Sequence, residues 1–426
     1  MTERHAYPAQ LAAYVRELWP VDAEPLPSGL EEILSTVYQA TLLRDEERQV
    51  TFRIVFAPAE SFSPGAGPPR GHLRLLFERA RNFDEHELRR LSPAAKYARS
   101  LVGVWGSAGA FAIWGIVHSG PRWLERTQGG RSLPAEFPGA PLVVRAFGPG
   151  LVAVARGDQT IAELRGGSLA RPGMDVFAAH WLPARFAEAR AELYALHEQA
   201  HANAREPWGE LDPDLIRVLS SHMVQRLIAT MRTAHHGGAI VMVPADCTAS
   251  EFLHLGYAFH EEEPRRRHRT LVLAAMRALA RAAAGDALDR PAGWTDYATE
   301  TRDPFPAIDE AMFEISHMLA ALTDVDGALV LTKSFEILGF GAEIVGDLPD
   351  VSQVAVARDL EGKLRTFEST EGVGTRHRSA YRLCAALHEA IAVIVSQDGA
   401  VRWVAWHDGA VTCWNYVPAD VGDGSR

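Results

Sequence analysis

The run EPWGELDPD at residues 206–214 separates two parts of the chain with different hydrophobic patterns. Before it, short apolar runs such as VTFRIVF and PLVVRAF alternate with turns rich in glycine and proline, a pattern typical of short strands. After it, amphipathic helical segments alternate with buried strand-like runs, which predicts a mixed sheet flanked by helices. Because a chain of 426 residues is longer than a domain with a single hydrophobic core usually is, we predict two domains. The first is an α+β domain over residues 1–205, ending in a charged connector helix from Pro183, and the second is an α/β domain over residues 206–415.

Charge and cysteine content exclude several classes of function. The formal net charge is −11, so a general nucleic-acid-binding role would need a local basic patch. The best candidate patch, Arg265 to Arg269, directly follows three glutamates, and we interpret it as a solvated charge run that opens a helix. Cys247, Cys384 and Cys413 lie far apart, which indicates neither a disulfide framework nor a zinc ribbon. Since the first residues carry no secretory pattern either, we expect a cytoplasmic protein.

One stretch, Ser100 to Val117, contains no charged residue and approaches the length of a membrane-spanning helix. Its four glycines favour a different interpretation, because glycine weakens an isolated helix and marks hairpin turns. We therefore predict two buried strands, LVGVW and FAIWGIV, joined by a turn, and no membrane span.

In the second half, apolar spacing predicts helices over residues 215–233, 270–284 and 308–322. Strands are predicted at AIVMVP, DGALVLTK, GAEIV, SQVAVARD, IAVIVS and VRWVAWHDG, with a further helix at SAYRLCAALHEA.

Polar residues collect in three segments at predicted strand ends and loops of this half. They are Asp326-Gly327-Ala328, Gly374-Thr375-Arg376-His377-Arg378 and Ser396-Gln397-Asp398. Glycine permits close backbone contact with a ligand, aspartate binds Mg²⁺ or Mn²⁺ or orients a hydroxyl, and arginine pairs with phosphate oxygens. A helix that begins after Gly374 and Thr375 also presents free N–H groups to an anion. This set of groups suits nucleotide phosphate chemistry.

The motifs DGALVL, GTRHRSA and IAVIVSQDG, in this order and at these intervals, resemble the diadenylate cyclase domain, whose hallmarks are D-G-A and R-H-R. HGGAIVMVP looks like the strand that begins the sheet of that domain, and the resemblance covers Asp212 to Asp408. It implies that two such domains face each other, each holding one ATP, and that each 3′-hydroxyl attacks the α-phosphate of the other ATP. The products would be cyclic di-AMP, a second messenger of bacterial signalling, and two pyrophosphates, with Mg²⁺ or Mn²⁺ as cofactor.

The resemblance also implies roles for individual residues. Asp326 would be the essential acid near the metal and the attacking hydroxyl, with Asp398 as a second candidate metal ligand. The phosphates would be held by Thr375, Arg376, His377, Arg378 and Ser396, and the nucleotide would contact the chain at Gly327, Ala328 and Gly374.

The chain departs from the family pattern at two places. Gln397 and Asp398 stand where relatives often carry two glutamates, and Val325 stands where many have histidine. Compared with those relatives, Gln397 therefore lacks a carboxylate and Asp398 carries it on a shorter side chain. An alternative is therefore a regulatory module that binds nucleotide with little turnover. In either case we expect the N-terminal domain to be a sensor for a signal that the sequence does not identify, and the second catalytic domain to come from another copy of the chain.

A second alternative is a zinc hydrolase, because His197, Glu198 and His201 match H-E-x-x-H in a predicted helix. No third ligand stands out downstream, and the same helix carries many charged residues. We favour surface histidines on an interdomain helix. We interpret His235-His236 as a helix-ending turn and His388 as a helix-face residue.

Overall fold

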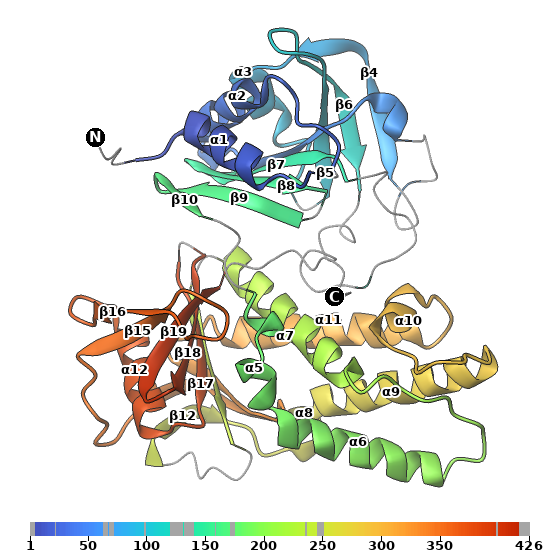
Figure 1. Ribbon diagram of the computed structural model, residues 1–426, viewed down its shortest axis with the longest axis vertical. Helices are drawn as coiled ribbons and strands as arrows, with labels where there is room; N and C mark the ends of the chain where they lie inside the picture. Colours follow the sequence, from blue (N-terminus) through green and yellow to red (C-terminus); the bar gives the residue numbers. More distant parts are fainter. Residues whose placement is uncertain are drawn as a thin grey trace. The chain divides into compact units, whose positions relative to one another are not determined.

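The structure of the chain is a computed structural model (Figure 1). It describes residues 5–21, 23–62, 67, 72–97, 99–119, 131, 140–157, 159–170, 175–234, 237–244, 251–397 and 399–416. The chain forms two compact units: residues 1–128, 132–173 and 419–426 make up the first, and residues 129–131 and 174–418 make up the second. The second unit thus begins before the boundary predicted at residue 205, and the helix expected as a connector lies within it.

The first unit is built around an eight-stranded sheet with strand order β10-β9-β8-β7-β3-β5-β6-β4. Neighbouring strands are antiparallel except β3 and β5, which run parallel. Helices α1 and α2 pack on each other and on β7, β8 and β9, and a core of aliphatic side chains fills the space between helices and sheet. The described elements of this unit are α1 (Pro8–Leu18), α2 (Leu30–Leu42), β1 (Arg44–Asp45), β2 (Arg48–Gln49), β3 (Phe52–Phe56), η1 (Ala59–Ser61), β4 (Leu73–Asn82), α3 (Glu85–Leu91), β5 (Ser100–Trp105), β6 (Ala112–His118), β7 (Leu142–Gly148), β8 (Leu151–Arg156), β9 (Gln159–Arg165) and β10 (Ser168–Ala170).

The uncharged stretch from Ser100 to Val117 forms the antiparallel hairpin of β5 and β6, as predicted. Two of its glycines lie in the turn with positive φ, Gly106 at 140° and Gly109 at 77°, a region that other residues rarely adopt. Among the described residues, every helix is too short or too polar to cross a membrane.

The second unit contains a nine-stranded sheet with strand order β12-β14-β13-β11-β17-β18-β19-β15-β16. β11 runs parallel to β13, and β15 runs parallel to β19, while the other pairs are antiparallel. Its described elements are η2 (Val176–Ala178), α5 (Trp181–Ala184), α6 (Ala187–Ala202), α7 (Leu215–Ala234), β11 (Gly238–Val243), β12 (Leu253–Ala258), α8 (Glu262–Arg265), α9 (Arg267–Gly285), α10 (Trp294–Thr299), α11 (Phe305–Leu322), β13 (Ala328–Thr332), β14 (Ile337–Ile344), β15 (Gln353–Ala357), β16 (Arg365–Ser369), α12 (Thr375–Ala386), β17 (Ile391–Val395), β18 (Val401–His407) and β19 (Ala410–Tyr416).

Helices cover both faces of this sheet, because its central strands are apolar on both sides. Along β11, Ile240 and Met242 face a core shared with α7, α9 and α11, whereas Ala239 and Val241 face a core shared with α12. Figure 1 shows α6, α7, α9 and α11 grouped together beside the sheet. The prediction of a mixed sheet with flanking helices is confirmed.

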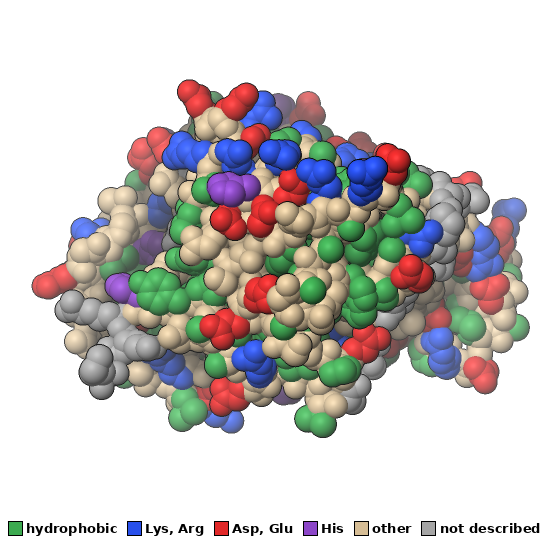
Figure 2. Space-filling model, turned by 90° about the horizontal axis from the view of Figure 1, so that it is seen from above, with side chains coloured by type: hydrophobic (Ala, Val, Ile, Leu, Met, Phe, Trp, Pro, Cys, Tyr) green, Lys and Arg blue, Asp and Glu red, His purple; other side chains and the backbone are tan. Residues whose placement is uncertain are grey.

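The prediction of a solvated basic run at Arg265 to Arg269 holds only in part, because His268 is 2% exposed and Arg265 and Arg269 are 24% and 23% exposed. In the basic run, Arg265 pairs with Glu336 at 3.0 Å and Arg269 with Glu192 at 2.6 Å. On the face drawn in Figure 2, basic and acidic side chains lie intermingled. Cys384 and Cys413 are free thiols, and burial raises the pKa of each to about 12. Cys247 lies outside the described residues.

Arg131, which lies between β6 and β7 in sequence, is a buried part of the second unit. Its guanidinium donates to the carbonyl oxygens of Tyr297 and Glu300 at 3.2 and 2.6 Å. It also lies 3.5 Å from one carboxylate oxygen of Asp309 on α11. Arg226 of α7 contacts the other carboxylate oxygen of Asp309 at 2.6 Å. Arg131 therefore ties α10 to α11 through charge-assisted hydrogen bonds to the carbonyls of Tyr297 and Glu300 and an ion pair with Asp309.

Replacing Arg131 with alanine should loosen α10. Losing these contacts leaves two carbonyls without a donor, which we expect to lower the local stability of α10 by about 2 kcal/mol. Amide hydrogen exchange in α10 should become roughly thirtyfold faster, measured by mass spectrometry. Arg281→Ala, which removes an exposed arginine 3.6 Å from Glu206 on the same unit, serves as control. Equal exchange of α10 in both variants would contradict this role of Arg131.

Candidate active site

The three polar segments predicted from the sequence meet at one edge of the second sheet. β11 and β13 run parallel and start at this edge, and β17, antiparallel to β11, ends there. Gly237 precedes β11, Asp326 and Gly327 precede β13, and Ser396 follows β17. Helix α12, which packs on β17 and β18, brings Arg376 to the same edge.

The closest measured contact between the motifs joins Arg376 to Asp326. A guanidinium nitrogen of Arg376 lies 3.6 Å from a carboxylate oxygen of Asp326. The Asp326 side chain is fully exposed, and Arg376 is 38% exposed, so both can reach a ligand in solvent. Residues fifty positions apart in sequence thus form a charged pair at the surface.

Gly237 allows Arg376 to approach the sheet. Its φ of 67° lies in the left-handed region. A Cβ at this position would stand 3.1 Å from a guanidinium nitrogen of Arg376 and 3.2 Å from the backbone nitrogen of Gln397. Both contacts are tight for a side-chain carbon, so a glycine leaves space for the guanidinium between β11 and the end of β17.

The backbone of the neighbouring strand β14 leaves no room for a side chain at Gly327. Its φ is 111°, and a Cβ there would stand 2.5 Å from the carbonyl carbon of Gly341 and 2.7 Å from the nitrogen of Ala342, both in β14. The side of Gly327 on which a ligand was expected is therefore filled by protein backbone. Ala328 is also buried, with its side chain in the core shared with α12. A nucleotide contact of either residue would have to use its backbone.

Helix α12 begins at Thr375, four residues earlier than the helix SAYRLCAALHEA predicted from the pattern, so the R-H-R motif forms its first turn. Gly374 is the N-cap residue and no side chain caps the helix, which leaves backbone N–H groups of the first turn facing outward. Thr375 and Arg378 are exposed, and Arg378 donates to the carbonyl oxygen of Val373 at 3.1 Å. His377 is half-buried, with its ring 6.2 Å from that of Tyr381.

Ser396 begins a tight turn after β17. Its N–H donates to Ala400 at 2.8 Å, and its carbonyl oxygen accepts from Gly399 at 2.9 Å. Arg232, at the end of α7, donates to the carbonyl oxygen of Gly399 at 2.9 Å, which places a further cationic side chain beside this turn. The sequence pattern gave no reason to single out Arg232. Asp398 lies outside the described residues.

The metal predicted for this site has one described carboxylate available, that of Asp326. Mg²⁺ is commonly held by one or two carboxylates together with substrate phosphates and water, and an exposed aspartate beside a helix N-terminus without a side-chain cap fits that set. Within the described part of the chain, no three His, Cys, Asp or Glu side chains are grouped to hold a metal by themselves.

An aromatic platform lies next to Asp326 and was missed by sequence reasoning. Tyr257 of β12 is 59% exposed and stacks on Phe340 of β14, with ring centroids 4.7 Å apart and planes at 15°. A Cβ at Gly341, whose φ is 60°, would stand 3.3 Å from the Tyr257 ring and 3.6 Å from the carbonyl oxygen of Asp326. Only the cross-strand pairing of β12 with β14 reveals this proximity.

The H-E-x-x-H residues lie on α6 without the surroundings of a zinc site. The rings of His197 and His201 both pack on Trp208, at 5.0 and 5.2 Å, while Glu198 is exposed. Burial, aided by neighbouring cationic groups, lowers the pKa of His197. No third ligand stands nearby in the described part of the chain, so packing explains this pair. The interpretation as surface histidines on an interdomain helix is wrong for His197, which is 7% exposed, and α6 lies within the second unit.

The interpretations of His235-His236 and of His388 have different outcomes. His235 and His236 lie outside the described residues. The helix-face interpretation of His388 is wrong, because α12 ends at Ala386 and the His388 ring stacks on Trp406 at 4.0 Å.

Residues 19–118 match the family model described as probable sensor domain DACNV, a sensor domain of diadenylate cyclase-type proteins. No curated protein matches the chain. A solved structure similar to it is that of a hypothetical membrane spanning protein from Bacillus cereus, with 16% identity and a TM-score of 0.24. The match covers 46% of this chain and 63% of that one, less than two thirds of its length. So low a score carries no argument. The prediction of an N-terminal sensor domain is confirmed for residues 19–118, and the catalytic domain stays a prediction.

The two motif glycines should respond differently to alanine. In Gly327→Ala, the new Cβ meets the backbone of β14 and the residue keeps a positive φ, so we expect the free energy of unfolding to fall by about 2–4 kcal/mol. Gly374 has a φ of −58° and open space around it, so Gly374→Ala should cost less than about 1 kcal/mol. Thermal unfolding of both full-length variants tests this. Similar melting temperatures would contradict the packing role of Gly327.

Proposed function

We propose that the chain is a diadenylate cyclase that condenses two ATP molecules into cyclic di-AMP and two pyrophosphates. The observation that carries this proposal is the 3.6 Å contact of Arg376 with Asp326, which unites the D-G-A and R-H-R motifs at one exposed sheet edge. The sensor-domain match over residues 19–118 supports it independently, because that domain accompanies diadenylate cyclase-type proteins.

Phosphoryl transfer depends mainly on positioning and on neutralising charge around phosphorus. In our proposal the triphosphate lies at the start of α12, where free N–H groups and Arg376 face the same space. Arg378, Thr375 and the Ser396 turn would complete the phosphate contacts. Asp326 would hold Mg²⁺ or Mn²⁺, whose charge helps to neutralise the phosphates, and would accept a hydrogen bond from the attacking 3′-hydroxyl.

The reaction joins two nucleotides, and this site is built from a single unit. Each of the two 3′-hydroxyls must reach the α-phosphate of the other ATP, so two second units have to face each other during turnover. Since Asp326 is fully exposed at the sheet edge, it is accessible to a nucleotide carried by a facing copy. We propose that the sensor domain regulates this juxtaposition.

The adenine base would stack on Tyr257. An exposed aromatic ring beside Asp326 offers a flat apolar surface, and stacking on such a ring contributes roughly 1–3 kcal/mol per base. The base, the 3′-hydroxyl and the phosphates would then lie along one edge of the sheet, from β12 across β13 to α12.

A regulatory module that binds nucleotide with little turnover is the second candidate. It is favoured by Gln397, which is exposed beside Gly237 and offers a neutral amide at a position where relatives often have a carboxylate. The two candidates differ in product formation and agree in nucleotide binding.

Purified full-length protein incubated with ATP and Mg²⁺ or Mn²⁺ should yield cyclic di-AMP, identified by mass. Asp326→Asn and Arg376→Ala should each lower the rate at least a hundredfold, because each removes a charge that acts in the transition state. Asp324→Asn, which changes an exposed acid two residues away, and Arg358→Ala should stay within about twofold of the wild type. ATP binding without product under both metals would instead establish the regulatory module.

Tyr257→Ala should weaken ATP use without slowing the chemical step. We expect KM for ATP to rise roughly tenfold with kcat nearly unchanged, since base stacking acts equally on substrate and transition state. Tyr257→Phe should behave like the wild type. Phe367→Ala removes a ring that is 63% exposed on β16, far along the sheet, and should leave both constants unchanged. A Tyr257→Ala variant with wild-type KM would rule out the stacking platform.

A further inference from the structure

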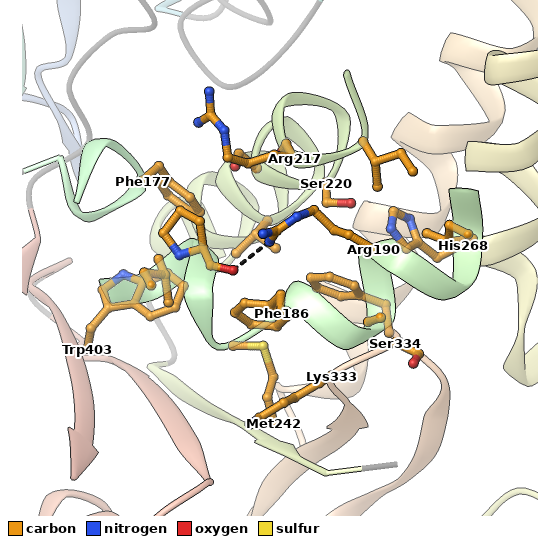
Figure 3. Close-up of a pocket in the computed structure, with 18 residues that line it drawn as sticks. Phe177, Phe186, Arg190, Arg217, Ser220, Met242, His268, Lys333, Ser334 and Trp403 are labelled. Atoms are coloured by element: carbon orange, nitrogen blue, oxygen red, sulfur yellow. Dashed lines mark hydrogen bonds between the residues drawn. The ribbon is translucent and has the colours of Figure 1, made fainter. Parts of the chain in front are cut away.

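A cavity of about 60 Å³ lies in the second unit on the face of the sheet opposite α12. Its walls come from α5, α6, α7, α9 and the turn between β13 and β14, and they include the rings of Phe186, Phe335 and Trp403 and the side chain of Met242. Figure 3 shows Phe186, Met242 and Trp403 with Arg190 and His268. A water molecule needs about 10–15 Å³ of such space, so the cavity has room for several waters or one small organic molecule.

Arg190 of α6 brings a positive charge to this apolar space, and the nearby carboxylate of Asp214 offsets that charge only in part, since burial and Arg217 outweigh it. Its guanidinium donates to the carbonyl oxygen of Pro183 at 2.5 Å, and no carboxylate of the described residues forms an ion pair with it. Burial, followed by the neighbouring Arg217, lowers the pKa of Arg190, so the surroundings favour an added anion. Arg217 differs, because it forms two hydrogen bonds with Asp214 and its guanidinium points away from the cavity (Figure 3).

His268 is a buried polar group at the cavity wall whose ring nitrogens have no hydrogen-bond partner among the described residues. The residue is 2% exposed. Burial lowers the pKa of His268 to about 4, so near neutral pH the ring is uncharged, with one donor and one acceptor. Buried polar groups are normally hydrogen-bonded, and such an exception beside a cavity points to an absent partner.

We propose that this cavity binds a small aromatic carboxylic acid. The aromatic ring would lie against Phe186, Phe335 and Met242, the carboxylate would pair with Arg190, and His268 would face a polar atom of the ligand. Apolar walls with a few placed polar groups are typical of small-molecule sites, and the guanidinium fork matches a carboxylate.

The cavity is separate from the candidate active site. Lys333 and Ser334, which line it, follow β13, whereas Asp326 precedes that strand. At about 3.3 Å per residue of extended chain, the two ends lie roughly 20 Å apart. Met242 and Trp403 also face the core opposite α12. A ligand here would not compete with ATP, and the proposal does not depend on the cyclase reaction.

The test is calorimetric titration of the full-length protein with benzoate. We expect saturable binding that persists with ATP present, and at least tenfold weaker binding of benzyl alcohol, which lacks the charge. Arg190→Gln should weaken benzoate binding at least tenfold, whereas the matched change Arg217→Gln should stay within about twofold. Absence of saturable benzoate binding, equal binding of benzyl alcohol, or equal loss in both arginine variants would each overturn the proposal.

A second measurement on the unmodified protein covers the case in which Arg190→Gln does not fold. Saturating benzoate should shift the imidazole ¹⁵N resonances of His268, assigned with His268→Phe. The resonances of His222 should not move, because this other buried histidine stacks on Trp294 away from the cavity walls. Unchanged His268 resonances at saturation would refute the assignment of this cavity.

Discussion

The pairing of β11 with β13 on one side and β17 on the other is the constraint on which the candidate site depends. The register places Ile240 opposite Leu329 in the parallel pair and opposite Val393 in the antiparallel pair. The segments that precede β11 and β13 and the segment that follows β17 must therefore lie at the same edge of the sheet. Because these strands are buried on both faces, a one-residue slip would turn each side chain into the opposite core and disrupt its packing, so core packing holds the edge in place. The position of Asp326 relative to Ser396 is thus a consequence of core packing.

The charges at this edge would allow one exposed acid to coexist with the phosphates of the proposed substrate. Arg376 and Arg232 bring cationic groups from two different helices, and the start of α12 adds the partial positive charge of the helix dipole. Asp326 is the acid that the described structure places beside Arg376. With Gln397 neutral, the edge carries fewer negative charges than a family member with two glutamates at this turn. A lower negative charge favours binding of the triphosphate and leaves less carboxylate to hold a metal, and these two effects separate nucleotide affinity from turnover.

Most strands and helices of the second unit could be predicted from periodicity, because α7 and α11 repeat apolar residues at helical spacing and β11, β13 and β17 are continuous apolar runs. The sequence motifs also singled out Asp326 and Arg376, which the fold brings within 3.6 Å of each other. What the pattern could not supply were relations across strands. Tyr257 reaches the site only because β12 pairs with β14, and Gly327 is a glycine because the β14 backbone presses on it. The first residue of α12 was misplaced because the motif T-R-H-R has no apolar periodicity of its own.

Helix α7 is an element that reaches both the cavity and the candidate site. Ser220 and Val224 in its first half line the cavity, and Arg232 near its end donates to Gly399 in the turn that begins with Ser396. At 1.5 Å per residue, this 20-residue helix spans about 30 Å, and a helix is stiff along its axis. The sheet does not readily pass a displacement from the cavity to the candidate site, since hydrogen bonds and tight packing on both faces hold its strands in place. Any occupant of the cavity that displaced α7 would therefore act on the turn after β17 through the Arg232 contact, and an occupant that left α7 in place would leave the candidate site unchanged.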